Sequence, residues 1–353
     1  MAVSGNFCTF LITGGAGFIG SHTALVLLEA GHSLVVLDNF TNSSAESLRR
    51  VAGLAGPSAA SRLDVVEGDI RNQADLERAF NAAPAGQPIE AVIHFAGLKA
   101  VAESVRAPLS YWDVNLSGSR QLLAVMQAQG CRMLVFSSSA TLYGMPEQVP
   151  IPETAPIQPI NPYGHSKAAV EQLLADLAGS EPGWRISRLR YFNPVGSHPS
   201  GCIGEDPLGV PSNLFPFVSQ VAVGRRPLLQ VFGGDWPTPD GSGVRDYIHV
   251  MDLAEGHQAA LHTLLAEEPQ LLTLNLGSGR GHSVLEVVTA FEAASGRTVP
   301  YSVVPRREGD AAMSVADPSL AAQRLGWHTR RSLAEICCDG WAWQCANPSG
   351  YNH

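Results

Sequence analysis

Short, continuously apolar runs alternate with longer amphipathic stretches through the first half of the chain. The apolar runs are found at 7–13, 33–38, 63–67, 90–95, 132–137 and 185–191. Between them lie segments with helical periodicity, including Ser21 to Ala30, Gln73 to Asn81, Gly118 to Ala128 and Ser166 to Leu177. Strands that are apolar throughout and separated by helices are typical of a parallel sheet covered on both faces. The pattern therefore predicts an α/β fold built on a doubly wound parallel sheet.

The pattern changes near residue 190, where proline and glycine become frequent and the alternation of strands and helices is lost. A chain of 353 residues also exceeds the usual size of a single hydrophobic core. We therefore predict two closely packed domains, residues 1–189 and a smaller α+β substrate-binding domain over residues 190–353. The second is expected to consist largely of loops and short helices, and some of its segments are allowed to pack back onto the first.

The composition is that of an ordinary soluble globular protein, with 45% hydrophobic and 16% charged residues. A formal net charge of −9 repels phosphate backbones, which argues against a nucleic-acid partner. No apolar run approaches the roughly 18 residues of a membrane-spanning helix, so we expect no membrane partner. The six cysteines show no CxxC spacing and the histidines form no HExxH pair. These features favour a cytoplasmic protein with reduced thiols and no metal site.

A glycine-rich turn joins the first apolar run to the first helical segment. Gly14, Gly17 and Gly20 form a GxxGxxG pattern, a variant of the dinucleotide fingerprint of Rossmann-type sheets. Glycine lets the backbone approach a pyrophosphate closely, and the N-terminus of the following helix offers free N–H groups to the anion. We assign Phe18 and Ile19, which lie inside this turn, to the same cofactor site.

An acidic residue ends the second apolar run. Asp38 stands where a carboxylate accepts hydrogen bonds from an adenosine ribose and repels a 2′-phosphate. NAD is therefore the predicted cofactor, and Asn39 is assigned to the same site. After the third run, Asp69 and Ile70 are placed beside the adenine. The alternative for Asp69 is the cap of the helix that follows.

Three further residues predict the chemistry. Tyr163 and Lys167, at i and i+4, share one face of a helix. Ser139 ends the fifth predicted strand, at the carboxyl edge where α/β sheets bind ligands. A free tyrosine has a pKa near 10, and lowering it by about three units requires roughly 4 kcal/mol of preferential stabilisation of the phenolate. The Lys167 ammonium and the positive nicotinamide of NAD+ are the expected sources. Tyr163 would then remove a hydroxyl proton while hydride leaves the same carbon for the cofactor, and Ser139 would hold the oxygen.

With these residues in this order, the chain resembles the extended short-chain dehydrogenase/reductases and, among them, the UDP-glucose 4-epimerases. The similarity runs from Phe10 to Tyr351. The segments that carry it are residues 92–101 (VIHFAGLKAV), 190–196 (RYFNPVG) and 243–250 (GVRDYIHV). Together they are far more specific than the glycine turn.

The resemblance implies further site residues. Those implied to contact NAD are Phe95, Lys99, Asn115, Lys167 and Phe192. Those implied to bind a UDP-sugar are Lys99, Ser139, Tyr163, Asn193, Asn213, Phe232, Arg245, Arg307, Asp310 and Ser314. The arginines suit this role because a planar guanidinium binds phosphate in a bidentate manner; the alternative for each is a plain surface charge.

Two positions depart from the family pattern. Some members have asparagine at the position of Val114, whereas here only Asn115 remains, which leaves that cofactor contact open. Members with tyrosine at the position of Ser314 resemble enzymes restricted to UDP-glucose and UDP-galactose. Members with a small residue there resemble enzymes that also accept N-acetylated sugars. Serine adds room beside the sugar 2-position, so we expect UDP-GlcNAc and UDP-GalNAc to be admitted.

The activity implied by the resemblance is reversible C4 epimerisation of UDP-glucose and UDP-galactose through a transient 4-keto sugar and bound NAD. One alternative is a nucleotide-sugar 4,6-dehydratase or decarboxylase on the same scaffold. Dehydratases usually carry an acid pair just after the serine or threonine, whereas Ser139 is followed by Ala140-Thr141. The other alternative is a non-catalytic NAD-binding sensor, which would need neither Tyr163 nor Lys167.

The same resemblance predicts that the chain pairs with a second copy of itself. Apolar positions in the helix over 116–126 and in the helix that begins at Ser166 suit a four-helix interface. We therefore expect a homodimer.

Overall fold

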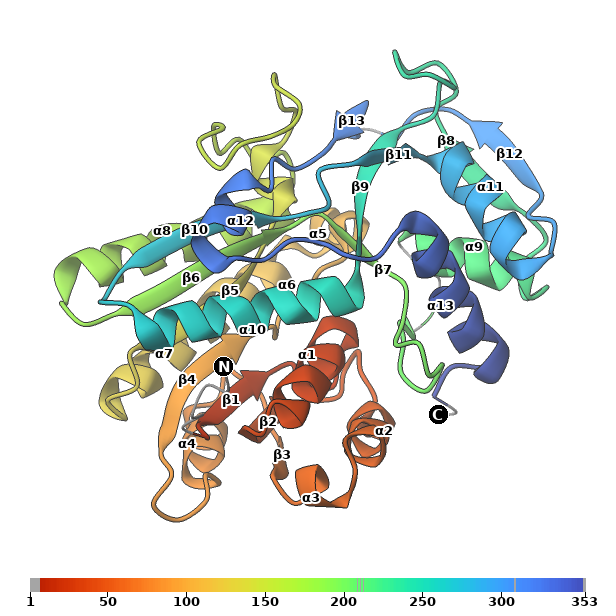
Figure 1. The fold of residues 1–353 in the computed structure, drawn as a ribbon. Coiled ribbons are helices and arrows are strands. Elements are labelled where there is room, and N and C mark those ends of the chain that lie inside the picture. Colours follow the sequence, from red (N-terminus) through yellow and green to blue (C-terminus); the bar gives the residue numbers. More distant parts are fainter. Residues whose placement is uncertain (1–6, 208, 210, 212, 308, 352–353) are drawn as a thin grey trace.

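A seven-stranded parallel sheet forms the centre of the larger part of the molecule (Figure 1). The computed structural model describes residues 7–207, 209, 211, 213–307 and 309–351. The strand order is β10-β6-β5-β4-β1-β2-β3, and every neighbouring pair is parallel. The strands are β1 (Thr9–Thr13), β2 (Ser33–Asp38), β3 (Leu63–Glu67), β4 (Ile89–His94), β5 (Met133–Ser139), β6 (Arg185–Tyr191) and β10 (Leu271–Leu276). This order runs outward from β1 in both directions, which is the predicted doubly wound arrangement.

Helices cover both faces of the sheet. One layer contains α1 (Phe18–Glu29), α2 (Ala45–Ala55), α3 (Pro57–Ala60), α10 (Val250–Ala266) and α12 (Ser319–Leu325), and the other contains α4 (Gln73–Asn81), α7 (Gly118–Ala128) and α8 (Pro162–Ser180). Successive side chains of a strand point to opposite faces. Phe10 and Ile12 accordingly join the core beneath α1 and α10, while Leu11 joins the core beneath α4, α7 and α8. Figure 1 shows α1 and α10 side by side.

Short helical segments lead into the second layer and follow the fifth strand. They are α5 (Val101–Arg106), α6 (Pro108–Tyr111), a π-helical segment η1 (Trp112–Ser117) that continues directly into α7, and a 3₁₀ segment η2 (Ala140–Tyr143) directly after β5. Isolated π-turns inside helices are often found at functional sites.

The smaller part of the molecule is built around β9 (Val244–His249). It forms a four-stranded sheet with β7 (Asn193–Val195), β11 (Gly281–Ser283) and β13 (Met313–Ser314), beside a parallel pair of β8 (Leu229–Phe232) and β12 (Tyr301–Val304). The helices α9 (Leu214–Ala222), α11 (Val284–Ser295) and α13 (Leu333–Ala346) share a separate hydrophobic core with these strands.

The expectation of loops and short helices after residue 190 is wrong. Helices α10, α11 and α13 contain 17, 12 and 14 residues. Capping boxes begin two of them, Ser283 with Glu286 and Ser332 with Glu335, in which each side chain bonds the other residue's backbone N–H. The S-x-x-E spacing was therefore a usable signal. Strand β10 and helix α10 pack onto the first domain, as the prediction allowed, while the boundary between residues 189 and 190 stays a prediction.

Two helices begin earlier than the periodicity indicated. Helix α1 begins at Phe18 rather than Ser21 because Gly17 is already its N-cap. Helix α8 begins at Pro162 rather than Ser166 because the Asn161 side chain caps it, accepting from the Gly164 N–H at 2.9 Å. The earlier start places both Tyr163 and Lys167 in the first two turns of α8.

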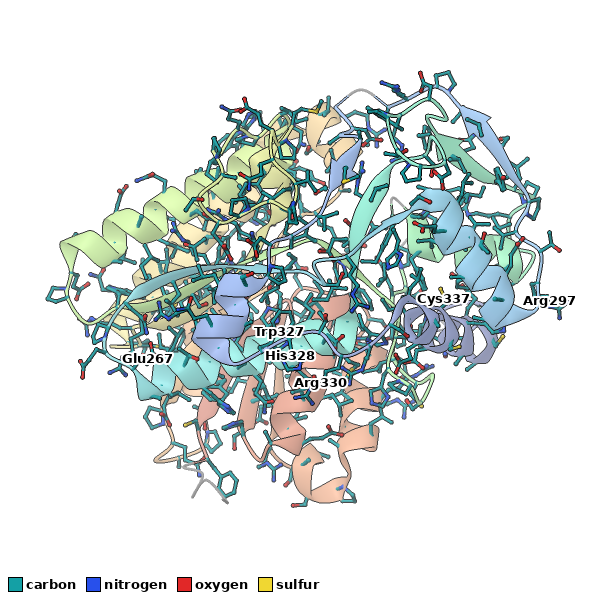
Figure 2. The ribbon with its side chains drawn as sticks, turned by 45° about the horizontal axis from the view of Figure 1, so that its top comes forward. Glu267, Arg297, Trp327, His328, Arg330 and Cys337 are labelled. Atoms are coloured by element: carbon teal, nitrogen blue, oxygen red, sulfur yellow. The ribbon has the colours of Figure 1, made fainter. Side chains whose placement is uncertain are left out.

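The segment after α12 binds the chain back to the sheet domain. Figure 2 labels Trp327 and Arg330 where this segment crosses α10. The Trp327 indole donates to the Asp252 carbonyl at 2.9 Å, and the Arg330 N–H donates to the Asp252 carboxylate at 3.2 Å. Within the described ranges, no helix combines the length and apolar character needed to cross a membrane.

Candidate active site

The glycine turn follows β1 and leaves no room for larger residues. Gly14 adopts φ of +71°, and a Cβ there would lie 2.6 Å from the backbone nitrogen of Ala96. A Cβ on Gly20 would overlap the Gly14 carbonyl oxygen. Gly17 is the N-cap of α1 and, as a glycine, has no side chain that could cover the N–H groups of the first helical turn. This bare backbone surface is what a dinucleotide pyrophosphate requires, and the residues present fit NAD.

Asp38 ends β2 and is buried, with 7% of its surface exposed. One carboxylate oxygen accepts from the Ala16 N–H at 2.9 Å, and the other accepts from the Phe40 N–H at 3.0 Å and the Ser43 hydroxyl at 2.8 Å. The carboxylate therefore fixes the glycine turn as well as standing at the predicted ribose position. Asn39 follows it and donates to the Asp69 carboxylate at 3.0 Å.

Asp69 lies at the same edge of the sheet, after β3. The Arg71 guanidinium binds both of its oxygens, at 2.9 and 2.8 Å, and holds the pKa of Asp69 at about 2. The alternative role for Asp69 was to cap the helix that follows. Asn72 fills that role, because its side chain caps α4 by accepting from the Ala74 N–H at 2.9 Å. The neighbouring Ile70 is buried.

Ser139, Tyr163 and Lys167 come together at the carboxyl end of β5. The Lys167 ammonium donates to the Ser137 carbonyl at 2.7 Å, and Ser139 and Tyr163 share a hydrogen bond. The Ser139 hydroxyl also accepts from the Thr141 N–H at 3.2 Å and from the Thr141 hydroxyl at 2.9 Å. The structure thus brings the three predicted catalytic residues into one cluster.

The electrostatics of this cluster differ from the prediction. Burial raises the pKa of Tyr163, and the hydrogen bond with Ser139 opposes that effect without reversing it. Burial lowers the pKa of Lys167 from its ordinary 10.5 to about 8, against the opposite effect of Glu171. The protein groups alone therefore do not produce the lowered tyrosine pKa that we expected. Further positive charge is needed to favour the phenolate.

Two predicted substrate residues share one carboxylate that the sequence did not single out. The Lys99 ammonium donates to Oε1 of Glu205 at 3.0 Å, and the Asn213 side chain donates to the same oxygen at 3.1 Å. Asn213 is the N-cap of α9, yet its side chain makes no capping bond. Glu205 follows a glycine in an irregular loop and belongs to no periodic pattern, so no sequence signal pointed to it.

The remaining substrate residues gather near β9. Arg245, on β9, has its guanidinium 3.9 Å from the Asp310 carboxylate, and it is paired in register with Ser314 on β13. Asn193 begins β7, which pairs with the far half of β9. Phe232 ends β8, and the guanidinium of Arg307, in the loop after β12, lies 3.8 Å from the centre of the Phe232 ring. These residues present paired guanidinium groups and an aromatic face.

The three other predicted cofactor residues lie near the carboxyl ends of β4 and β6. Phe95 follows β4 and packs against His257 with ring centres 4.8 Å apart, and Phe192 follows β6 and is buried. Asn115 lies in the π-helical segment, where its amide bonds both backbone groups of Leu98 (2.8 and 3.0 Å) and the Ser166 hydroxyl (2.9 Å). These contacts join the turn after β4 to helix α8, so Asn115 has a structural role. Across the described residues, no cluster of three or more His, Cys, Asp or Glu side chains is arranged to hold a metal ion.

Comparisons with known proteins place this arrangement in a family. The model of the GDP-mannose 4,6 dehydratase family matches residues 11–339. The chain is 54% identical to UDP-glucose 4-epimerase 2 of Arabidopsis thaliana over 97% of its length and 96% of that protein, and 54% identical to human UDP-glucose 4-epimerase over 97% of each chain. It is also similar to the crystal structure of the epimerase from Stenotrophomonas maltophila with bound NAD and formylated UDP-arabinopyranose, with 48% identity, a TM-score of 0.92 and coverage of 97% and 99%. The chain therefore belongs to the UDP-glucose 4-epimerases, NAD-dependent isomerases within the extended short-chain dehydrogenase/reductases.

Proposed function

We propose that this chain interconverts UDP-glucose and UDP-galactose at C4, with Tyr163 as the group that removes and returns the hydroxyl proton. The observation that carries the proposal is the joint placement of Ser139, Tyr163 and Lys167 at the end of β5 in a fold whose glycine turn fits NAD. When bound, NAD supplies a hydride acceptor that carries positive charge. That charge is what the buried phenol lacks in the protein alone.

The protein groups divide the remaining work. Ser139 holds the reacting oxygen by a hydrogen bond, and Tyr163 takes its proton as general base. Returning hydride to the opposite face of the 4-keto sugar requires the sugar to turn while the nucleotide stays fixed. Arg245 and Arg307 provide the charge for a pyrophosphate anchor, and Lys99 and Asn213 provide further donors.

Elimination chemistry is a weaker candidate on this scaffold. A dehydratase must protonate a departing hydroxyl, which calls for acidic groups beside the serine. The residues after Ser139 are Ala140 and Thr141, and the Thr141 hydroxyl is already bonded to Ser139. An isomerase needs no such acid pair.

The first experiment is conversion of UDP-galactose to UDP-glucose by the purified protein with no NAD added, followed by chromatography. Conversion by the wild type, and none by Tyr163→Phe, supports epimerisation with a retained cofactor and with Tyr163 as the base. If the wild type is silent, adding NAD separates loss of cofactor from the wrong chemistry. Continued silence with NAD present contradicts the proposal.

The substrate range extends to N-acetylated sugars in this proposal. Ser314 lies on β13 in register with Arg245, and its short side chain is partly exposed. A Ser314→Tyr variant, which restores a ring at that position, is expected to lose turnover of UDP-GlcNAc and to keep turnover of UDP-galactose. Unchanged turnover of UDP-GlcNAc by this variant would overturn the extension.

The assembly that we propose is a homodimer through α7 and α8. Beside α8, the short helices α5 and α6 expose Val105 (63%) and Leu109 (81%), apolar side chains that an interface would cover. Sedimentation analysis is expected to give twice the chain mass of 37.4 kDa. Leu109→Glu should shift the protein toward the single-chain mass without unfolding it, because Leu109 packs little against its own chain.

A cytoplasmic location is proposed from the cysteines. Burial raises the pKa of the Cys131 thiol to about 11 and that of the Cys337 thiol to about 12, so both stay protonated and unreactive. Cys337 is buried, whereas the neighbouring Cys338 is exposed. Microscopy of a fluorescent fusion tests the location, and signal confined to a secretory compartment would contradict it.

A further inference from the structure

A buried ion pair joins the catalytic helix α8 to strand β6. Glu171, one turn after Lys167 on α8, accepts from Arg190 on β6 through both carboxylate oxygens, at 2.9 and 2.6 Å. The two side chains are only 6% and 5% exposed. A buried pair of this kind is costly to desolvate and is therefore weak evidence for stability by itself. Its position beside the reacting groups suggests another use.

Glu171 also bonds the strand that carries the catalytic serine. The Ser138 hydroxyl donates to Oε1 of Glu171 at 2.5 Å. Three successive residues at the end of β5 thus engage α8: the Ser137 carbonyl accepts from Lys167, the Ser138 hydroxyl binds Glu171, and Ser139 bonds Tyr163. These bonds fix the distance between β5 and α8 next to Ser139 and Tyr163.

The titratable and charged groups around Lys167 come from several elements. On α8 they are Tyr163 and Glu171; on β4, His94; on β6, Arg188, Arg190 and Tyr191; and beyond Arg190, Tyr143 of η2 and Glu153. Burial lowers the pKa of His94 to about 3, so this imidazole is neutral at working pH. Glu171 is the acidic group whose charge favours the ammonium form of Lys167.

We propose that Glu171 is a positioning residue for the reaction: its carboxylate fixes Ser138 and Arg190, and its charge holds the Lys167 ammonium against the Ser137 carbonyl. The proposal rests on the proposed function, in which that ammonium supports the Tyr163 phenolate. In this role Glu171 touches neither substrate nor cofactor. It helps to keep the reacting groups charged and in place.

The test compares Glu171→Gln with the double variant Glu171→Gln/Arg190→Gln. The single variant keeps the shape of the carboxyl but leaves Arg190 without its anion, so it is expected to be less stable. The double variant removes that unpaired cation and is expected to regain thermal stability. Asp176→Asn is the matched control, because Asp176 is an exposed carboxylate on the same helix that bonds Gln172.

Two readouts separate positioning from plain stability. In both Glu171 variants, the pH at which epimerisation declines on the alkaline side is expected to fall by about half a unit or more, because the ammonium has lost the anion that favours it. Titration of the Tyr163 phenolate by difference absorbance, with Tyr163→Phe as the blank, is expected to move to higher pH. Asp176→Asn should change neither.

A wild-type pH profile and a wild-type Tyr163 titration in the double variant would overturn the proposal and leave Glu171 as part of the core only. The phenolate titration needs no turnover. It therefore tests the positioning role even if the wild-type protein fails to interconvert the two sugars, a failure that would count against the proposed function instead.

Discussion

The guanidinium of Arg50 donates a hydrogen bond to the side-chain oxygen of Asn347 at 2.6 Å and so links α2 of the sheet domain to the C-terminal end of the chain. The same nitrogen donates to the Cys202 carbonyl at 3.0 Å, and the guanidinium lies 5.1 Å from the centre of the Tyr351 ring. Tyr351 in turn bonds both backbone groups of Gly204. Arg50 therefore helps to hold the loop that carries Glu205.

Replacing Arg50 by methionine should loosen this link. We expect the free energy of unfolding to fall by about 2 kcal/mol, since hydrogen bonds from a charged donor are lost in a mostly buried setting. The KM for UDP-galactose should rise more than kcat falls, because the loop positions Lys99 and Asn213 rather than the reacting oxygen. Urea unfolding and steady-state kinetics measure both.

The neighbouring residue provides the control. The Arg49 side chain is 74% exposed and, among the residues that the structure describes, bonds only to Glu46. Arg49→Met should therefore change stability by no more than about 0.5 kcal/mol. Equal losses of stability in the two variants would show that the link through Arg50 contributes no more than an exposed arginine does.

Gly20→Ala should abolish cofactor retention. The added methyl group would overlap the Gly14 carbonyl, so either the turn opens or α1 shifts, and both movements spoil the pyrophosphate surface. We expect protein that purifies without NAD, judged from its absorbance and from NAD released on denaturation. Gly53→Ala is the matched control: it lies in α2 with open space around it and should stabilise the helix by up to about 1 kcal/mol. NAD content at the wild-type level in Gly20→Ala would refute this.

As the pH rises above about 8, we expect Lys167 to make turnover fall and its own contribution to stability rise. Its pKa in the folded protein is about 8, so the ammonium that supports the phenolate is lost as pH rises through that value and turnover should decline. The unfolded chain keeps its ordinary pKa of 10.5 and binds more protons between pH 8 and 10.5. The contribution of Lys167 to stability should therefore rise over this window. Unfolding of wild type and Lys167→Met across it measures the difference, and a constant difference would contradict the lowered pKa.

The sequence predicted the sheet and the catalytic cluster because local pattern and local spacing determine them. Short apolar runs separated by helical segments favour strands covered on both faces, and β1 and β2 are buried throughout, whereas β3 at the edge of the sheet is partly exposed. Tyr163 and Lys167 lie four residues apart on one helix. The glycine turn and Asp38 are likewise defined by residues near one another in the chain. In each of these cases the residue type and its local geometry are sufficient.

The parts that the sequence did not reveal depend on contacts between distant segments. Glu205 meets Lys99 across 106 residues, and Arg50 meets Asn347 across 297. Periodicity carries no information about such pairs. The upward direction of the Tyr163 pKa also escaped prediction, because it reflects burial by the whole fold rather than the charge of a neighbour in sequence.

The stacked pair of Arg307 and Phe232 gives a prediction about substrate affinity. Arg307→Lys keeps the positive charge but loses the planar guanidinium, which both lies over the ring at 3.8 Å and can bind phosphate in a bidentate manner. We expect the KM for UDP-galactose to rise about tenfold with kcat changed less than about twofold, because an anchor on the nucleotide binds the ground state and the transition state equally. Calorimetry should show weaker binding of UDP but unchanged binding of uridine, which lacks the phosphates. Arg225→Lys, at an exposed arginine that bonds the Pro348 carbonyl, should leave all of these values at the wild-type level. If uridine binding weakens as much as UDP binding, Arg307 acts through the ring and not through the phosphates.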